Sequence, residues 1–229
     1  MIDPLAGSPW SMEATVRGFA RSLANETLMA FAAGEFAQAP RSRLLDIGCG
    51  AGRNAVPLAR EGWHVLGTDL SWPMLQAAAR RGMTEGAADR MHLALASMDQ
   101  LPVASRSIDL IVAHGIWNLA GSAAEFRRAV AEASRVAAPG AALFVFTFSR
   151  NTLEPDAMPV EGEPFAFTQF SGAPQCFLTR DQLTAELGAA GFTLDNAIPF
   201  AEHNRPPEGT VHALRTPVLF EAAFRFTSV

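Results

Sequence analysis

Short apolar runs alternate with stretches of helical periodicity through the first two thirds of the chain. Apolar residues recur at roughly helical spacing from Ser11 to Gln38, which predicts one N-terminal helix that Pro40 ends and, with it, a helical cap within residues 1–40. Further on, the pattern predicts strands at 43–48, 63–69, 91–98, 107–115 and 139–149, and helices at 53–62, 71–82 and 122–137. Ser71 is placed as an N-cap, and Ser122 with Glu125 three residues later is placed as a capping box. Apolar strands that alternate with helices are typical of a parallel sheet covered on both faces, so we expect a doubly wound α/β fold.

The alternation stops after Arg150. Residues 151–175 are rich in Pro, Gly and Phe without a clear period, which favours a functional loop or lid. A helix at 179–192 and strands at 193–200 and 217–227 follow, and we expect these two strands to pair antiparallel at the sheet edge because no helix separates them. The chain is thus predicted to be one domain, 1–229, with lid segments at 151–178 and 201–216.

Composition narrows the classes of function. The net charge is −5 and the arginines are scattered, which disfavours nucleic-acid binding. The chain contains no lysine and no tyrosine, so it has no Schiff-base or P-loop lysine and no tyrosine acid. No apolar run reaches the roughly 18 residues that span a bilayer, and the first residues lack a signal-peptide pattern. With only Cys49 and Cys176 as cysteines, we expect a cytoplasmic protein, monomeric or homodimeric, without a membrane partner.

The stretch LLDIGCGAGRN, residues 44–54, places three glycines between a predicted strand and a predicted helix. This is the edge at which doubly wound folds bind nucleotides, although a tight turn alone is the simpler alternative. Asp69 follows Gly50 by 19 residues and is placed to reach ribose hydroxyls, or else to cap Ser71. The third glycine, Gly52, comes one residue earlier than in dinucleotide sites, and Asp46 would repel a pyrophosphate. These features favour a nucleoside that carries a cationic, amino-acid-like tail.

These residues resemble the class I S-adenosylmethionine-dependent methyltransferases. LLDIGCGAGRN resembles the first motif of that family and VLGTDLS its acidic second-strand motif, while ASMDQLPVASRSIDLIVA and SRVAAPGAALFVF resemble later segments in the same order. The resemblance covers about residues 43–149. It implies a Rossmann-like methyltransferase fold with a seven-stranded, mostly parallel sheet and one antiparallel edge strand, and it implies S-adenosyl-L-methionine as the cofactor.

The resemblance also implies roles for individual residues. Asp46 would orient the methionine amino group, Asp69 would bind the ribose hydroxyls and Asp99 would accept from the adenine amino group. The remaining implied cofactor contacts are Gly48, Cys49, Gly50 and Gly52 in the loop, Leu70 beside adenine, Met98 through its backbone, and His114 at the methionine portion. Asp99 as a surface turn acid and His114 as a strand-end support are the alternatives.

The transferred methyl group needs a positioned acceptor, and a base only where the acceptor begins protonated. Candidate bases are His114, which we take as the catalytic candidate, His203 and His212, whereas His64 and His92 are predicted to be structural. Trp10, Trp117 and Phe170 could line the acceptor pocket, or lie in the core as aromatic residues more often do. No Cys or His spacing indicates a metal site.

Motifs typical of DNA-base and catechol methylation are missing after the fourth predicted strand, so we expect a small-molecule acceptor. Two alternatives remain. A binding or regulatory module could keep the fold without catalysis, and a nicotinamide-dependent oxidoreductase is disfavoured by the glycine spacing.

Overall fold

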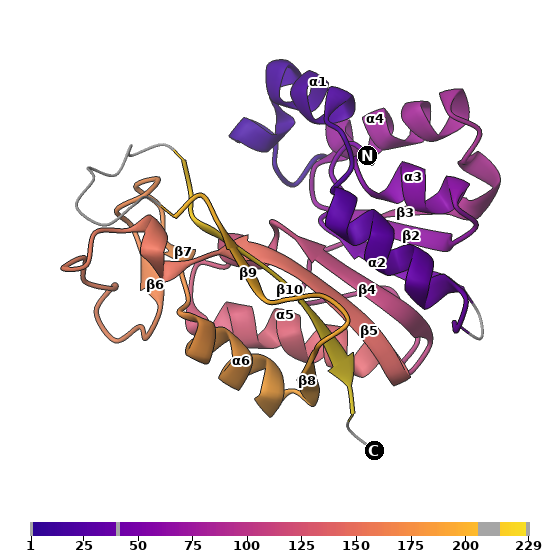
Figure 1. The fold of residues 1–229 in the computed structure, drawn as a ribbon. Coiled ribbons are helices and arrows are strands. Elements are labelled where there is room, and N and C mark those ends of the chain that lie inside the picture. Colours follow the sequence, from indigo (N-terminus) through magenta and orange to yellow (C-terminus); the bar gives the residue numbers. More distant parts are fainter. Residues whose placement is uncertain (1, 40–41, 206–215, 228–229) are drawn as a thin grey trace.

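One sheet organises the computed structural model, which describes residues 2–39, 42–205 and 216–227 (Figure 1). Its strands are β1 (Arg43–Ile47), β2 (His64–Asp69), β3 (Met91–Leu95), β4 (Ile108–His114), β5 (Ala137–Phe148), β8 (Phe192–Asp195), β9 (Ala201–His203) and β10 (Leu219–Phe226). The order is β3-β2-β1-β4-β5-β10-β8, with β9 also paired to β10. Strands β1 to β5 run parallel, which confirms the predicted doubly wound, mostly parallel sheet.

The antiparallel strand lies inside the sheet and not at its margin. β8 and β10 correspond to the predicted strands at 193–200 and 217–227, and they do pair antiparallel. However, β10 also pairs antiparallel with β5, so β8 and β9 lie outside it. β10 is long and almost entirely buried, which suits an interior position, whereas the four-residue β8 forms the edge. β9 adds an eighth strand from a segment that was predicted to be part of the lid.

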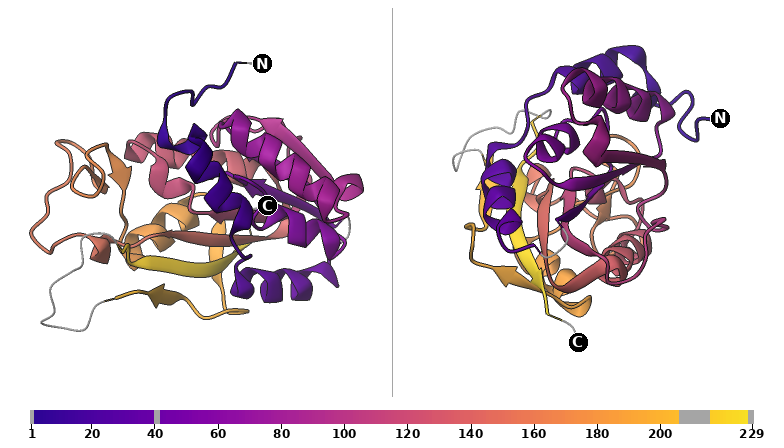
Figure 2. Two further views of the ribbon diagram at one scale, coloured as in Figure 1. Left: turned by 90° about the horizontal axis from the view of Figure 1, so that it is seen from above. Right: turned by 90° about the vertical axis from the view of Figure 1, so that its right-hand side faces the viewer.

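Helices cover both faces of the sheet. They are α1 (Glu13–Arg21), α2 (Glu26–Phe36), α3 (Ala55–Arg60), α4 (Trp72–Thr84), α5 (Ala123–Val136) and α6 (Arg180–Ala189). Figures 1 and 2 show α2, α3 and α4 on one face, with α1 stacked on α4, and α5 and α6 on the other. Two separate apolar cores result, because Leu44, Leu110 and Phe144 face α2 to α4 while Leu45, Ile111 and Leu143 face α5 and α6.

Hydroxyl side chains begin the helices as predicted. Ser71 accepts a hydrogen bond from the Met74 N–H, and Ser122 accepts one from the Glu125 N–H. The predicted capping box at Ser122 is incomplete, because the Glu125 carboxylate accepts from the Gly121 N–H, one residue before the cap (2.8 Å). Each interaction satisfies a backbone donor that the first helical turn leaves free.

The N-terminal segment forms two helices, so the prediction of one continuous helix is wrong. α1 ends at Arg21, and the chain is extended at Ser22 and Asn25. The Asn25 side chain accepts from the Leu28 N–H at 2.7 Å and begins α2. The helical spacing of apolar residues continues across this break, so the spacing alone does not reveal that a second helix, α2, begins there. Pro40, the predicted end of the helix, lies outside the described residues.

Much of the predicted lid at 151–178 belongs to the core. Phe165, Phe167, Cys176, Phe177 and Leu178 are all buried and pack with α5. Two short strands, β6 (Ala166–Phe167) and β7 (Gln175–Cys176), pair as a hairpin beyond the carboxyl end of β5 (Figure 1). Apolar burial therefore fixes this segment, and a lid function for it stays a prediction.

Candidate functional site

The glycine loop, residues 48–52, connects β1 to α3 at the carboxyl edge of the sheet. Its three glycines have φ values of +71°, +54° and +79°, which L-residues adopt at a cost. A Cβ on Gly48 would lie 2.7 Å from Cδ1 of Ile116, and one on Gly52 would lie 2.9 Å from Cγ2 of Val56. The packing of the protein itself therefore requires Gly48 and Gly52.

Gly50 is different, because a Cβ built on it would make only ordinary van der Waals contacts. The nearest atoms to a Cβ built on Gly50 are Cδ1 of Phe19, at 3.9 Å, and Sδ of Met74, at 4.0 Å. Phe19 belongs to α1, which covers this side of the loop. The packing of the protein itself therefore does not require a glycine at position 50, where α1 lies over the loop.

Backbone N–H groups of the loop are used within the protein. Gly48 and Cys49 both donate to the carbonyl of Thr68 (2.8 and 2.9 Å), and Gly52 donates to the carbonyl of Cys49 (3.0 Å). Gly50 donates to Oδ2 of Asp69 at 2.9 Å. A pyrophosphate in a dinucleotide site needs such donors at the loop and the helix N-terminus. The hydrogen bonds of this loop therefore disfavour a dinucleotide.

Asp46 lies under the loop and carries an unsatisfied oxygen. Its residue is 2% exposed, and Oδ2 has no hydrogen-bond partner among the described residues. Burial first, and then the charge of Asp69, raise the pKa of Asp46 from 3.8 to about 7, although a hydrogen bond from the Ala55 N–H opposes this rise. A buried carboxylate without a partner is costly unless a cation or donor satisfies it. The ammonium group of an amino-acid tail fits this requirement.

Asp69 ends β2 and is tied to two backbone groups. Oδ2 accepts from Gly50, and Oδ1 accepts from the Ser71 N–H at 2.8 Å. The alternative role as a cap for Ser71 is therefore present in the structure. Because each carboxylate oxygen can accept twice, the carboxylate keeps capacity for ribose hydroxyls. Burial raises the pKa of Asp69, and hydrogen bonds from the N–H groups of Ser71, Gly50 and Leu70 oppose that rise. The adjacent Leu70 is half-buried.

Asp99 follows β3, and both of its oxygens already have side-chain partners. Oδ1 accepts from Oγ of Ser97 at 2.5 Å, and Oδ2 accepts from Nε of Arg128 at 3.2 Å. These donors, the Ser97 hydroxyl first, hold the pKa of Asp99 below its usual value. Met98 before it is buried against the core that α5 covers. The adenine contacts implied for these two residues stay predictions.

His114 ends β4 and is half-buried. Its ring stacks on Phe146 with centroids 4.3 Å apart and an angle of 7° between the planes. Burial, with the nearby positive charge of Arg53, lowers the pKa of His114 from 6.5 to about 4. A group that holds a proton so weakly is a poor general base at neutral pH. The geometry thus favours a neutral His114 that supports the site.

Beside His114 lies a polar cluster that was not predicted from the sequence. The side chain of Glu221, on β10, is 5% exposed. Its Oε2 accepts from Nδ2 of Asn25 at 2.7 Å, and its Oε1 lies 3.3 Å from Nε2 of His203. Nδ2 of Asn25 also lies 3.4 Å from Nε2 of His114. An acid within the apolar stretch PVLFEAAFRF was the available signal, but its partners come from distant segments.

The predicted pocket aromatics lie in three different places. Trp117 is fully buried in the core, edge-on to Phe126 at a centroid distance of 6.0 Å, as the core alternative has it. Trp10 is 36% exposed and packs edge-on against Phe19 over the glycine loop. Phe170 is half-buried and contacts Phe148 at the carboxyl end of β5. Trp10 and Phe170 are thus at the same edge as the loop, while Trp117 is within the core.

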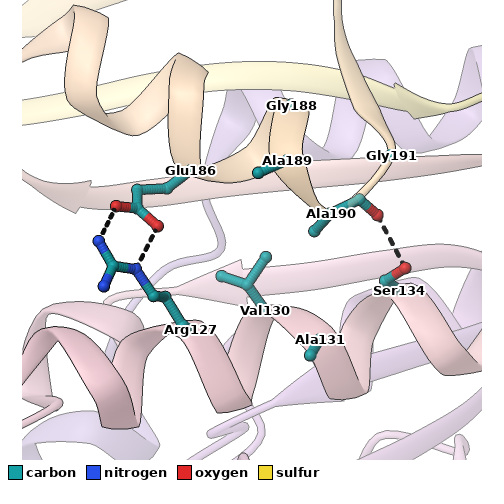
Figure 3. A pocket seen from close by; sticks show the side chains of 9 residues that line it. All are labelled: Arg127, Val130, Ala131, Ser134, Glu186, Gly188, Ala189, Ala190 and Gly191. Atoms are coloured by element: carbon teal, nitrogen blue, oxygen red, sulfur yellow. Dashed lines mark hydrogen bonds and ion pairs between the residues drawn. The ribbon is translucent and has the colours of Figure 1, made fainter.

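Two surface hollows lie away from this edge. The first, about 680 Å³, separates α5 from α6 (Figure 3). Arg127 and Glu186 pair in bidentate fashion at one end, and Oγ of Ser134 donates to the Ala190 carbonyl at the other. The second, about 780 Å³, lies at the opposite edge of the sheet, where His64 and His92 are found. Neither hollow brings an unpaired buried polar group to its surface, so we place the candidate site at the glycine loop.

The described residues contain no group of three or more metal-binding side chains. Within the same ranges, the helices are too short or too polar to span a bilayer. His212, one of the predicted base candidates, lies outside the described residues, as does most of the segment at 201–216.

Comparisons with known proteins agree with this geometry. Residues 44–140 match the family model described as a methyltransferase domain. The chain is 30% identical over 159 residues to an arsenite methyltransferase of Halobacterium salinarum, and the aligned region covers 68% of this chain and 38% of the relative. It is 37% identical over 121 residues to a ubiquinone/menaquinone biosynthesis C-methyltransferase of Syntrophotalea carbinolica, covering 52% and 48%. The chain thus spans less than half the length of these curated relatives.

The fold also matches a solved structure. A SAM-dependent methyltransferase from Methanosarcina mazei superposes with a TM-score of 0.66 at 20% sequence identity, over 82% of this chain and 93% of that one. At this identity the likeness shows the fold. With the matched segment at 44–140 and the strand order, the chain belongs to the class I S-adenosylmethionine-dependent methyltransferases.

Proposed function

We propose that this chain binds S-adenosylmethionine at the glycine loop and transfers its methyl group to a small-molecule acceptor. The observation that carries the proposal is the buried Oδ2 of Asp46, two residues before the glycine loop, which has no hydrogen-bond partner among the described residues. A cationic amino-acid tail would satisfy that oxygen, and the loop N–H groups are already used within the protein.

Each residue of the site has a distinct part in this proposal. The cofactor, when bound, supplies an electrophilic methyl group and a neutral leaving group. Asp46 holds the ammonium group, Asp69 accepts from the ribose hydroxyls, and Gly50 lets the ligand approach the main chain. Positioning and the exclusion of water supply most of the catalysis that such a displacement needs. The α1 helix over the loop, with Phe19, supports such exclusion.

The acceptor chemistry can be narrowed by the side chains present. Arsenite, the substrate in the name of one relative, binds preferentially to thiolates. The chain has two cysteines, both buried, and Cys49 packs on the α2 to α4 face while Cys176 packs on the α5 face. They cannot bind one arsenic atom together. Phe148 and Phe170 are half-buried and in contact with each other at the carboxyl edge, which favours an apolar, aromatic acceptor such as a quinol.

Calorimetry with S-adenosylhomocysteine and, separately, with NAD tests the binding part of the proposal. We expect the first to bind and the second not to bind, and preferential binding of NAD would contradict the proposal. Incubation with methyl-labelled S-adenosylmethionine and a panel of small acceptors tests the transfer. Tight cofactor binding without transfer to any acceptor would favour the alternative of a non-catalytic binding module.

A further inference from the structure

We propose that His203 and Glu221 form the general base of this site and that the acceptor is an aromatic hydroxyl, a phenol or a hydroquinone. This inference rests on the proposed function and adds the proton transfer and the acceptor class to it. The pair lies on adjacent strands, β9 and β10, at the level of the last residues of β5.

The hydrogen bonds of Asn25 fix the direction of the network. Its Oδ1 accepts from the Leu28 N–H, so the amide cannot be turned over without losing the cap of α2. Its Nδ2 therefore faces Glu221 and His114, and donates to Oε2 of Glu221 at 2.7 Å. Toward His114 the same group lies 3.4 Å from Nε2, which fits an unprotonated acceptor nitrogen. Asn25 thus holds one oxygen of the buried carboxylate in place.

The second oxygen of Glu221 sets the tautomer of His203. An ionised carboxylate only accepts hydrogen bonds, so Nε2 of His203 is the donor in the 3.3 Å contact with Oε1. Nδ1 then carries the lone pair, and no described residue donates to it. A carboxylate that orients an imidazole and stabilises its protonated form is the arrangement that makes a histidine an effective base. The His203 side chain is 45% exposed, so Nδ1 can reach a bound acceptor and later release a proton to water.

Strand register connects this pair to the cofactor loop. His114 on β4 lies opposite Phe146 on β5, and Phe146 lies opposite Glu221 on β10. Asn25 contacts the other side of the site as well, because its N–H donates to Oδ1 of Asn54 at the start of α3 (3.1 Å). The pair therefore lies along the same edge as the glycine loop, with Glu221 two strands and His203 three strands beyond β4.

Aromatic side chains on both faces of the sheet end at this edge, Phe146 on the face that α2 to α4 cover and Phe148 with Phe170 on the face that α5 and α6 cover, and they suggest the acceptor class. Phe146 lies between His114 and Glu221 in the strand register, and Phe148 lies opposite Leu219 two pairs further along. Phe170 contacts Phe148 edge-on at 5.3 Å. Half-buried rings beside a base suit a planar, apolar acceptor with one acidic hydroxyl.

The methyl transfer and the proton transfer occur together. The acceptor hydroxyl gives its proton to Nδ1 of His203 while its oxygen forms the new bond to the methyl carbon. The bond from that carbon to sulfur breaks, and its electron pair stays on sulfur. The protonated His203 is stabilised by Glu221 and then releases its proton to solvent.

Several charged groups lie near His203 and Glu221 and can affect how activity depends on pH. Glu221 faces His203 from β10, and Glu202 and Arg205, which pair at 3.2 Å, are its neighbours in sequence. Arg53 acts on His114 from the loop. Among these, Glu221 is the carboxylate in hydrogen-bond contact with His203, so its removal should destabilise the protonated imidazole and shift the activity profile toward lower pH.

The test compares wild type with His203→Gln, Glu221→Gln and a control, His92→Gln, which alters an exposed histidine at the opposite edge of the sheet. Probes are phenol, hydroquinone and 4-nitrophenol, with 2-mercaptoethanol and benzylamine as acceptors of other classes. Binding of S-adenosylhomocysteine and thermal unfolding are measured for every variant, so that loss of folding is separated from loss of the base.

We expect His203→Gln to lower kcat for phenol and hydroquinone by about 10²- to 10⁴-fold. The loss should be much smaller for 4-nitrophenol under alkaline conditions, where that acceptor is already ionised. Glu221→Gln should lower kcat and shift the acid limb of its pH profile to lower pH, whereas a structural role alone would lower activity equally at all pH values. His92→Gln should behave as wild type.

Full activity of His203→Gln on phenol would overturn the inference. A wild-type protein that binds S-adenosylhomocysteine normally but methylates none of the three phenols would also overturn it. If that protein methylates the thiol or the amine instead, the proposed function survives and only this inference fails. Absence of S-adenosylhomocysteine binding would instead overturn the proposed function, and with it this inference.

Discussion

Replacement of Asp46 by asparagine tests the feature on which the site rests. The substitution keeps the size of the side chain and removes its charge. In the protein without ligand, the Asp46 carboxyl is buried, and its Oδ2 has no partner among the described residues. Removing a charge of this kind should stabilise the ligand-free fold wherever the carboxyl would otherwise be ionised.

The magnitude follows from the pKa. Burial raises the pKa of Asp46 from 3.8 to about 7, so the folded protein holds this proton more tightly than the unfolded chain does. The group therefore costs nothing below its unfolded pKa, and the cost grows as the pH rises from about 4 to about 7. By linkage, this cost is about 1.5 kcal/mol at pH 5 and about 4 kcal/mol at pH 8. Wild type should thus lose about 2–3 kcal/mol relative to the Asp46→Asn variant between these pH values.

Urea titration at pH 5 and pH 8 measures this difference, because other groups contribute equally to both proteins. Calorimetry in buffers of different ionisation enthalpy gives a second readout. An ammonium group bound at Asp46 would lower its pKa, so cofactor binding near pH 7 should release a proton in wild type but not in the variant. Unfolding curves whose pH dependence is the same for both proteins would refute the assignment of a buried, unpartnered carboxylate.

Three further substitutions separate ligand contacts from packing. Gly50→Val should abolish S-adenosylhomocysteine binding. The control Gly86→Val should bind normally, because Gly86 also has a positive φ and has open space around it. Equal binding by both variants in calorimetry would show that no ligand approaches Gly50. Asp69→Ala should weaken that binding by about 1–3 kcal/mol through lost acceptors, and an unchanged dissociation constant would leave Asp69 as a cap only. Gly48→Ala should destabilise the fold by about 2–4 kcal/mol, because the added Cβ overpacks on Ile116 and the backbone has a positive φ. Adding Ile116→Ala should recover part of this loss of stability. A double variant that is no more stable than Gly48→Ala in urea titration would contradict the packing role.

The alternation of apolar strands and helices was sufficient to predict the doubly wound core. Each of the first five predicted strands has a counterpart whose two ends lie within three residues of the predicted ends. Two helices start at the predicted serines, Ser71 and Ser122. These features are local, because strand burial and helix capping depend on nearby residues. The predicted continuous helix failed for the same reason: the apolar period extends across Asn25, and only its side-chain cap reveals a new start.

Features set by distant pairing could not be predicted from local patterns. Glu221 and His203 come together because β9 pairs with β10, and β9 arose from a segment that resembled a proline-rich connection. Asn25 reaches the same carboxylate from a position 196 residues away in sequence. The buried part of the segment at 151–178 was likewise hidden, since irregular segments show no period even when they are packed. Glycines 48 and 52 were predicted as ligand contacts, and the structure adds a packing reason for each.

A crystal structure with S-adenosylhomocysteine tests the central claim most directly. The account predicts the product along the carboxyl edge of the sheet, with its amino group in hydrogen-bond contact with Oδ2 of Asp46, its ribose hydroxyls on Asp69 and its backbone-facing atoms over Gly50. Product bound elsewhere, or an Asp46 oxygen still without a partner in the complex, would contradict it.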